Sequence, residues 1–237
     1  MRHFILNTKN YSELAGGKFV SLLNDFAELS SEKRYRGSIQ LSLALPAFSL
    51  GFATSRFPSL DLLVQHVDDA EMGATTGFLV PEMARFFGAR GSLVNHSEHR
   101  ISENQIAKTI PRLRDLQMVS ILCARDDREV ESFSRLSPDF IAIEPPELIG
   151  SGVAVSKARP ELIENSRRAL ELSKPKGSTT ELICGAGIVD GVDSRLAVEL
   201  GAEGILVASG VIKSPDWKAK ISELADGIIG AKEPRVR

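Results

Sequence analysis

Eight short apolar runs recur along the chain at intervals of about 30 residues, the length of one strand-plus-helix unit. Several of them are continuously apolar and rich in β-branched residues. This is typical of parallel strands that are covered on both faces. The pattern predicts strands at His3–Asn7, Ser38–Ala44, Leu62–Gln65, Ser92–Asn95, Val119–Cys123, Phe140–Glu144, Glu181–Cys184 and Ile205–Ala208.

Helical periodicity lies between several of these runs. A helix is predicted to begin with Pro160 at a first-turn position, and another to end at Gly201 as its C-terminal cap. The stretch Phe48–Phe57 is not clearly helical. The apolar positions that define the predicted helix faces are Phe19, Leu22, Leu23 and Phe26; Leu162, Ala169, Leu170 and Leu172; Leu196, Ala197 and Leu200; and Trp217, Ile221, Leu224 and Ile228.

The alternation of strands and helices predicts an α/β fold, a single (β/α)8 TIM barrel of eight parallel strands ringed by helices. The 237 residues are slightly fewer than the ~250 typical of this fold. No linker interrupts the rhythm, so we expect one domain over residues 1–237. An open doubly wound sheet is the alternative, weakened because no G-x-G-x-x-G motif follows the first strand.

The composition is that of an ordinary globular protein, with 43% hydrophobic and 25% charged residues. It excludes a collagen, a disordered tail and a small disulfide scaffold. The 29 basic and 31 acidic side chains give a formal net charge of −2, which argues against a surface that binds nucleic acid or a membrane. The first apolar run is too short for a signal peptide and no run approaches a membrane span, so we expect a cytoplasmic protein.

The two cysteines and the few histidines give little sign of a metal or a disulfide. Cys123 and Cys184 each lie in an apolar run, which predicts two buried, reduced thiols. His96 and His99 are three residues apart, but no third ligand stands in a recognisable pattern, and such short matches often arise by chance. We therefore predict no metal site.

Polar side chains follow several predicted strands at their carboxyl ends, where the chemistry of such a barrel takes place. Asn7 and Lys9 end the first strand, His96 and Glu98 follow the fourth, and Glu144 ends the sixth. A lysine, a histidine and a glutamate are thus predicted to converge on one mouth of the barrel.

Small residues follow the last two strands, as Gly185-Ala186-Gly187 and Ala208-Ser209-Gly210. Barrels of this kind commonly bind phosphate at these two loops. Backbone N–H groups can approach an anion closely there because no bulky side chain intrudes. The sequence therefore predicts an anion site beside the same mouth.

Each of these signals has an ordinary explanation when it is taken alone. A single histidine is usually structural, a glutamate at a strand end often caps a helix, and Gly-x-Gly is common in turns. His66 is interpreted as a supporting residue, and His3 lies at the wrong end of the first strand for chemistry. The convergence of several signals at matching strand ends is what favours a site.

Four segments resemble the triosephosphate isomerase family: Asn7–Lys9, Asn95–Glu98, Glu144–Gly152 and Cys184–Ile188. They stand in the family's order, and the resemblance covers nearly the whole chain. The form E-P-P-E-L-I-G with G-A-G-I is similar to the shorter, archaeal-type branch. The resemblance implies an isomerase of glycolysis and gluconeogenesis that interconverts dihydroxyacetone phosphate and glyceraldehyde 3-phosphate without a cofactor.

The resemblance also implies four catalytic residues. Glu144 matches the family's catalytic base, and His96 matches the neutral imidazole that donates to the substrate oxygens. The pKa of His96 is expected to be lowered by a nearby helix N-terminus. Lys9 would direct a positive charge toward the anionic substrate, and Asn7 would contact the substrate through its amide.

Further residues are implied around these four. Glu98 would orient Lys9, and Ser97 would cap or support a short helix after His96. The phosphate would bind main-chain N–H groups, although the family usually has Gly-Gly where Ala208 and Ser209 stand. The residues expected to bind phosphate or substrate are Asn7, Lys9, Ile149, Gly150, Gly185, Ala186, Gly187, Ala208 and Ser209.

The segment after Glu144 would form a mobile lid that excludes water from the reaction. Many family members have a tryptophan where Glu147 stands, and the contact made by Glu147 is not evident from the sequence. The predicted lid residues are Pro145, Pro146, Glu147, Leu148, Ile149, Gly150, Ser151 and Gly152.

The stretch Gly73–Gly77 resembles the family loop that crosses into a neighbouring subunit. Phe78 follows it where the family more often has glutamate, and an apolar residue would suit a permanent interface. We therefore expect a homodimer or a larger assembly through the loop around Thr75 and Thr76, with a phosphorylated triose as substrate and no nucleic-acid or membrane partner.

Two other functions stay open on the sequence. A different phosphate-binding barrel enzyme would share the loops after the last two strands. Such enzymes do not generally combine Lys9, His96 and Glu144 at the first, fourth and sixth strands. A non-catalytic binder of a phosphorylated ligand would need none of the three, so their presence favours the isomerase.

Overall fold

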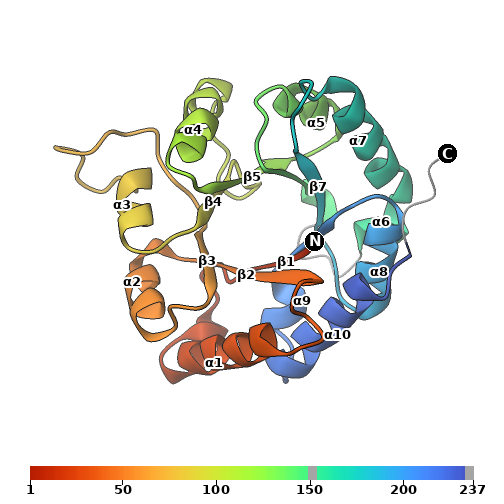
Figure 1. The fold of residues 1–237 in the computed structure, drawn as a ribbon, viewed down its shortest axis with the longest axis horizontal. Helices are drawn as coiled ribbons and strands as arrows, with labels where there is room; N and C mark the ends of the chain where they lie inside the picture. The colour runs from red at the N-terminus through yellow and green to blue at the C-terminus, as the bar shows by residue number, and fades with distance from the viewer. Residues whose placement is uncertain (149–153, 233–237) are drawn as a thin grey trace.

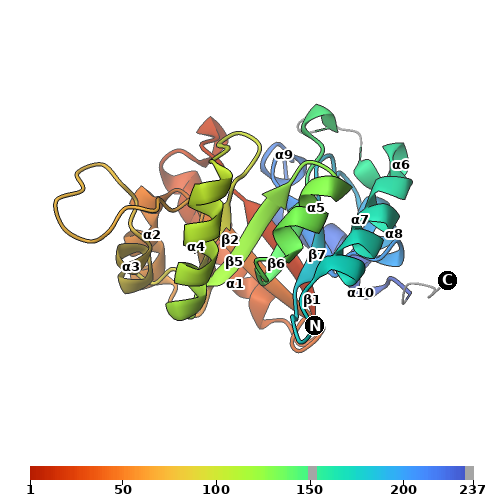
Figure 2. The same ribbon diagram turned by 90° about the horizontal axis from the view of Figure 1, so that it is seen from above.

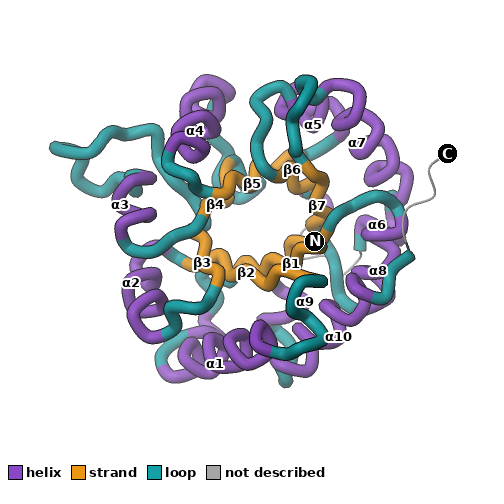
Figure 3. The backbone as a smooth tube through the Cα atoms, viewed as in Figure 1, coloured by secondary structure: helices purple, strands orange, loops and turns teal. Residues whose placement is uncertain are grey.

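Eight parallel strands close into a barrel in the computed structural model, which describes residues 1–148 and 154–232. Each strand pairs with the next one along the chain, and the last pairs with the first. Figures 1 and 3 show the strands as a central ring inside the helices. The strands are β1 (Arg2–Asn7), β2 (Ile39–Leu45), β3 (Asp61–Val64), β4 (Gly91–Val94), β5 (Val119–Ala124), β6 (Phe140–Ile143), β7 (Glu181–Gly185) and β8 (Gly204–Val207).

This architecture confirms the predicted barrel, and the alternative of an open doubly wound sheet is wrong. All eight predicted strands are present, and no end differs from the prediction by more than one residue. Side chains inside the ring form one apolar cluster, while those between strands and helices form a larger one. The strands appear as continuous apolar runs because neither face meets water. The inner cluster consists of Ile5, Ala44, Leu63, Leu93, Ile121, Cys123, Ala142, Ile183 and Leu206.

Helices cover the outside of the barrel. Those predicted from periodicity are α1, α7, α8 and α10, and α7 begins at Pro160 as expected. No helix in the described ranges is long and apolar enough to cross a membrane. The helices are α1 (Gly17–Ser31), α2 (Ala47–Arg56), α3 (Pro81–Phe86), α4 (Glu103–Asp115), α5 (Asp127–Ser134), α6 (Val155–Ala158), α7 (Pro160–Ser173), α8 (Gly191–Glu199), α9 (Ser209–Ile212) and α10 (Trp217–Ile229), with 3-10 turns η1 (Ser12–Leu14) and η2 (Pro146–Leu148).

The helix α2 is not evident from the sequence pattern of this region. Leu50 and Ala53 are buried on the side facing the barrel, whereas Phe48 and Phe52 are exposed. Apolar residues therefore occupy more than one face of α2. This hides the one-sided periodicity by which an amphipathic helix is recognised.

The predicted placement of Leu172 in the core is wrong. Leu172 is 79% exposed, although the prediction places it on the buried face of α7. That face carries Leu162, Ser166 and Leu170. Leu172 lies two residues beyond Leu170, which is about 200° around the helix.

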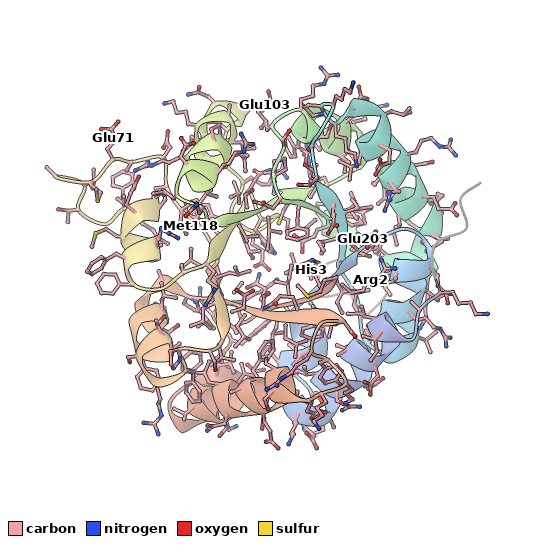
Figure 4. All side chains as sticks on the ribbon, in the orientation of Figure 1. Arg2, His3, Glu71, Glu103, Met118 and Glu203 are labelled. Atoms are coloured by element: carbon pink, nitrogen blue, oxygen red, sulfur yellow. The ribbon has the colours of Figure 1, made fainter. Side chains whose placement is uncertain are left out.

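The carboxyl ends of the strands form the edge of the barrel opposite the N terminus. Figure 2 shows α9 at that edge and the N terminus at the other. In both views the segment between β3 and α3, residues 65–80, projects away from the ring. Figure 4 labels Glu71 on this projecting loop, and His3 near the start of β1.

Candidate active site

A pocket lies at the carboxyl ends of the strands and brings the predicted lysine, histidine and glutamate together. Lys9 follows β1, His96 follows β4, and Glu144 follows β6. Gly185, Ser97 and Glu98 are not among the residues that line the pocket. The lining residues are Asn7, Lys9, His96, Glu144, Ala186, Gly187, Ile188, Leu206, Val207, Ala208, Ser209 and Gly210.

Lys9 is held by its own loop and by the end of β3. Its φ of +46° is a left-handed conformation, and the Asn7 amide oxygen accepts its N–H at 3.0 Å. The Gln65 amide donates to the carbonyl oxygen of Lys9 and to the Thr8 hydroxyl, both at 3.2 Å. The Lys9 ammonium lies 2.6 Å from a carboxylate oxygen of Glu98. The ammonium is therefore fixed beside the pocket.

Asn95 shapes the loop that carries His96. Its φ of +62° turns the chain sharply after β4. Its buried side chain donates to the carbonyl oxygen of Cys123 and accepts the N–H of Ile101, both at 3.1 Å. The bond from Ile101 joins the end of the loop to its start, and the bond to Cys123 ties the loop to β5, so the position of His96 is set by β5 as well as by β4.

The hydrogen position on His96 follows from its neighbours. The N–H of Glu98 donates to Nδ1 at 3.2 Å. Nδ1 must therefore be unprotonated, which places the ring hydrogen of the neutral form on Nε2. Nε2 lies 3.6 Å from the Oε1 atom of Glu144. The neutral ring can thus donate into the pocket.

The expected lowering of the His96 pKa by a helix N-terminus is not found. Burial lowers the pKa of His96, but the carboxylates of Glu144 and Glu98 together outweigh this effect, and the net pKa is raised above 6.5. A turn rather than a helix follows His96, and α4 begins only at Glu103. Ser97 therefore caps no helix; that role belongs to Ser102, whose hydroxyl accepts the N–H of Gln105.

Glu144 is 5% exposed and lines the pocket at the end of β6. Burial raises its pKa, but His96, the Cys123 thiol and Lys9 favour the carboxylate, and the net pKa lies below the usual value. Its Oε2 atom is buried and has no hydrogen-bond partner among the described residues. Such an unpaired oxygen is costly in a folded protein, and because Glu144 lines the pocket it is an acceptor open to a ligand.

Gly185 does not line the pocket but makes room for Glu144. A Cβ atom at Gly185 would lie 2.5 Å from the Cγ of Glu144. This distance is impossible without displacing the carboxylate. The contact with Glu144 gives Gly185 a structural role of its own, and its part in phosphate binding stays a prediction.

The small-residue loops after β7 and β8 form the opposite side of the pocket. Ala186 and Gly187 are both left-handed, with φ of +67° and +70°. A Cβ at Gly210 would lie 2.3 Å from the carbonyl oxygen of Ile188, so the two loops touch where a side chain cannot fit. Their backbones together line the pocket beside Ser209.

Comparison with known proteins decides between the possible barrel enzymes. A family model described as triosephosphate isomerase matches residues 3–224. A triosephosphate isomerase of Cenarchaeum symbiosum is 47% identical over 94% of this chain and 96% of its own length. Those of Archaeoglobus fulgidus and Methanothermus fervidus are 41% and 39% identical, over 93% of this chain and 95% and 96% of their own.

The chain belongs to the triosephosphate isomerase family. The three relatives named above come from archaea, in agreement with the branch that the sequence resembles. The family is one of isomerases, so the chain is an enzyme by membership.

The lid that the family resemblance implies is described only at its beginning. Pro146–Leu148 forms the 3-10 turn η2, and Glu147 contacts Arg159 at the start of α7, with Oε1 and Nη1 2.8 Å apart. This ion pair answers what Glu147 contacts in place of the family's tryptophan. Ile149, Gly150, Ser151 and Gly152 lie outside the described residues.

The projecting loop after β3 is held at its base. Asp68 accepts the N–H of Leu79 at 2.6 Å through its carboxylate, and its own N–H donates to the carbonyl oxygen of Leu79. His66 stacks on His99 with ring centroids 4.1 Å apart, in agreement with a supporting position. Thr75 and Thr76 lie on the part of the loop beyond this base.

Sequence reasoning missed three supporting residues, Gln65, Asn95 and Cys123. Gln65 ends a predicted strand, and Asn95 precedes His96, but neither position reveals where the amide points. Cys123 is a buried free thiol, as predicted, and contributes to the ionisation of Glu144. Within residues 1–148 and 154–232, no group of three His, Cys, Asp or Glu side chains is placed to hold a metal.

Proposed function

We propose that the chain interconverts dihydroxyacetone phosphate and glyceraldehyde 3-phosphate, a reaction of glycolysis and gluconeogenesis, without a cofactor. The observation that supports this most is the geometry around Glu144. Its Oε1 atom lies 3.6 Å from His96 Nε2, Lys9 lines the same pocket, and small-residue loops close the other side. An acid–base pair beside an anion site suits the isomerisation of a phosphorylated triose.

Glu144 is the proposed base. Its lowered pKa keeps it ionised at neutral pH. It would take a proton from the carbon next to the substrate carbonyl, and the electron pair of that C–H bond would move into an enediolate. The same carboxyl group would return the proton to the neighbouring carbon, while the hydroxyl proton of the first carbon would pass to the former carbonyl oxygen. A positioned base contributes about 10²–10⁴-fold to such a step.

His96 and Lys9 would stabilise the charge that develops on the substrate oxygens. The Nε2–H of neutral His96 is aimed at the pocket, as the hydrogen bond from Glu98 to Nδ1 requires. The Lys9 ammonium adds a positive charge, and its ion pair with Glu98 would orient it. Asn7 lines the same side and would contact the substrate through its amide.

The phosphate group would bind to backbone N–H groups of the loops after β7 and β8. Ala186 and Gly187 line the pocket from one loop, and Ala208 and Ser209 from the other. Phosphate sites in barrels are commonly built from these two loops and the short helix that follows β8. Here α9 begins at Ser209.

We also propose that the chain assembles at least as a homodimer through the loop around Thr75 and Thr76. Large apolar side chains are exposed on and beside this loop, and exposed apolar patches commonly mark protein interfaces. A monomeric mass by analytical ultracentrifugation at micromolar concentration would contradict the proposal. The exposed residues are Phe48 and Phe52 on α2, Met72 and Phe78 on the loop, and Met83, Phe86 and Phe87 on or next to α3.

A coupled assay of glyceraldehyde 3-phosphate conversion tests the activity. We expect fast turnover in both directions and competitive inhibition by 2-phosphoglycolate, which resembles the enediolate phosphate. Tight binding of the inhibitor without turnover would favour another phosphate-handling barrel or a non-catalytic binder. Absence of both would contradict the proposed anion site itself.

A further inference from the structure

The short helix α6 packs against the outer side of the loop after β7, residues 186–190. The N–H of Val155 donates to the carbonyl oxygen of Ala186 at 3.5 Å. Lys157 Nζ lies 2.6 Å from Oδ1 of Asp193 and 3.4 Å from Oδ2 of Asp190. Two residues of α6 thus contact the beginning and the end of this loop.

Asp193 is the buried partner in this arrangement. Its side chain is 2% exposed, whereas that of Lys157 is about half exposed. Its Oδ2 atom accepts the N–H groups of Val189 and Asp190, at 3.0 and 3.3 Å, and its Oδ1 atom faces Lys157. A buried carboxylate is stable only when it is paired. The charge of Lys157 therefore supports the carboxylate that holds the end of the loop.

The loop depends on such outside contacts for its position. Ala186 and Gly187 adopt left-handed conformations, which are disfavoured for alanine. Both residues line the pocket on the side proposed for the phosphate. A shift of this loop would move the phosphate-binding backbone, while His96 and Glu144 are held by other strands.

We infer that Lys157 is a positioning residue for phosphate binding. Through its ion pair with the buried Asp193 it fixes the loop of residues 186–190, without touching the substrate. The inference rests on the proposed function, because it concerns the phosphate side of that same site.

The test compares the parent enzyme with Lys157→Met, at a temperature where circular dichroism shows both to be folded. The KM for glyceraldehyde 3-phosphate and the Ki for 2-phosphoglycolate should each rise about tenfold, because a small displacement of a binding group has large effects. The kcat should stay within about twofold of the parent value, because the acid–base residues are not moved. A merely structural role would lower the melting temperature without this separation of KM from kcat.

Three further variants sharpen the result. Lys157→Arg keeps the charge and should stay near the parent. Lys157→Met combined with Asp193→Asn removes the buried charge but keeps an oxygen for the N–H of Val189, so it should recover most of the lost affinity. The matched control is Lys218→Met, which breaks an ion pair of the same 2.6 Å length to the exposed Glu28 and should change neither KM nor Ki.

If Lys157→Met does not fold, Lys157→Gln is used and the same direction is expected. Unchanged KM and Ki in an active enzyme would overturn the inference, as would a loss confined to kcat. Absence of turnover and of 2-phosphoglycolate binding in the parent itself would overturn the proposed function, and the inference with it. The two failures are therefore distinguishable.

Discussion

The carboxylates Asp61 and Asp139 at one end of the barrel and Glu144 at the other are paired in different ways. At the N-terminal end, hydroxyls and carboxylates of neighbouring strands satisfy one another. Ser42 donates to Asp61 at 2.5 Å, and Ser120 donates to Asp139 at 2.8 Å. At the mouth, Glu144 keeps a buried oxygen without a hydrogen-bond partner in the described part of the chain. Pairs closed on themselves stabilise the fold, whereas an open acceptor is available to a substrate.

The two ends of the barrel also differ in where their left-handed backbone conformations lie. Lys9, Asn95 and Ala186 follow β1, β4 and β7 in left-handed conformations, and each of their loops contributes to the pocket. Gln117 and Ser137 are also left-handed, but they follow α4 and α5, where such residues commonly end helices. The strain at the mouth, of the order of 1–3 kcal/mol for each residue, serves the placement of side chains and loops.

Replacement of a histidine at each end gives the largest expected contrast. His96→Gln should lower kcat about 10²–10³-fold, because a hydrogen-bond donor to the developing oxyanion is lost. His3→Gln at the other end should leave kcat near the parent value. Steady-state kinetics measures both, and a loss of less than threefold in His96→Gln would contradict its role.

Two glycines test the same contrast through sterics. Gly185→Ala should lower kcat about 10²-fold, because its Cβ would meet the Cγ of Glu144 at 2.5 Å and displace the carboxylate. Gly204→Ala should instead lower the free energy of unfolding by about 1–3 kcal/mol, since its Cβ would lie 2.0 Å from the carbonyl oxygen of His3. Urea unfolding and kcat of the folded fraction measure the two effects. A loss of stability alone in Gly185→Ala, together with a loss of kcat in the folded fraction of Gly204→Ala, would contradict the contrast between the two ends.

Removal of the charge at Lys9 should act on affinity. Lys9→Met should weaken 2-phosphoglycolate binding about 10–100-fold, the range expected for one charge-assisted contact. Isothermal titration calorimetry measures the dissociation constant. Lys218→Met, on the outer helix α10, serves as the control and should bind like the parent. Equal affinity in Lys9→Met would show that its ammonium does not face the ligand.

The smallest effect concerns the pH dependence of stability at the N-terminal end. Burial, helped by the terminal amine, lowers the pKa of His3 to about 4, although Glu203 opposes the shift. The unfolded chain binds this proton below about pH 6.5. The stabilisation is therefore complete above pH 6.5 and is lost as the pH falls toward 4.

Compared with His3→Phe, the parent should lose about 1–2 kcal/mol more unfolding free energy between pH 7 and 5. Phenylalanine is chosen because the His3 ring already packs on Phe140, with centroids 4.5 Å apart. Urea titrations at the two pH values give the difference. Parallel pH dependence in both proteins would show that His3 is not buried in its neutral form.

The sequence predicts the strands and the convergence of Lys9, His96 and Glu144 because both depend on local pattern and on strand ends. It does not predict the role of Gly185, since that role is a contact with Glu144 on the neighbouring strand. It also places Leu172 in the core, because apolar character alone does not say which face of α7 is covered. The raised pKa of His96 depends on the carboxylate opposite it, which no local spacing reveals.

The most direct measurement is hydrogen exchange from deuterated water into the substrate carbon, followed by NMR in the parent and in Glu144→Gln. The variant should keep its 2-phosphoglycolate affinity but lose both turnover and deuterium incorporation, by about 10²–10⁴-fold. Incorporation at the parent rate in Glu144→Gln would show that another group takes the proton, and would contradict the central claim.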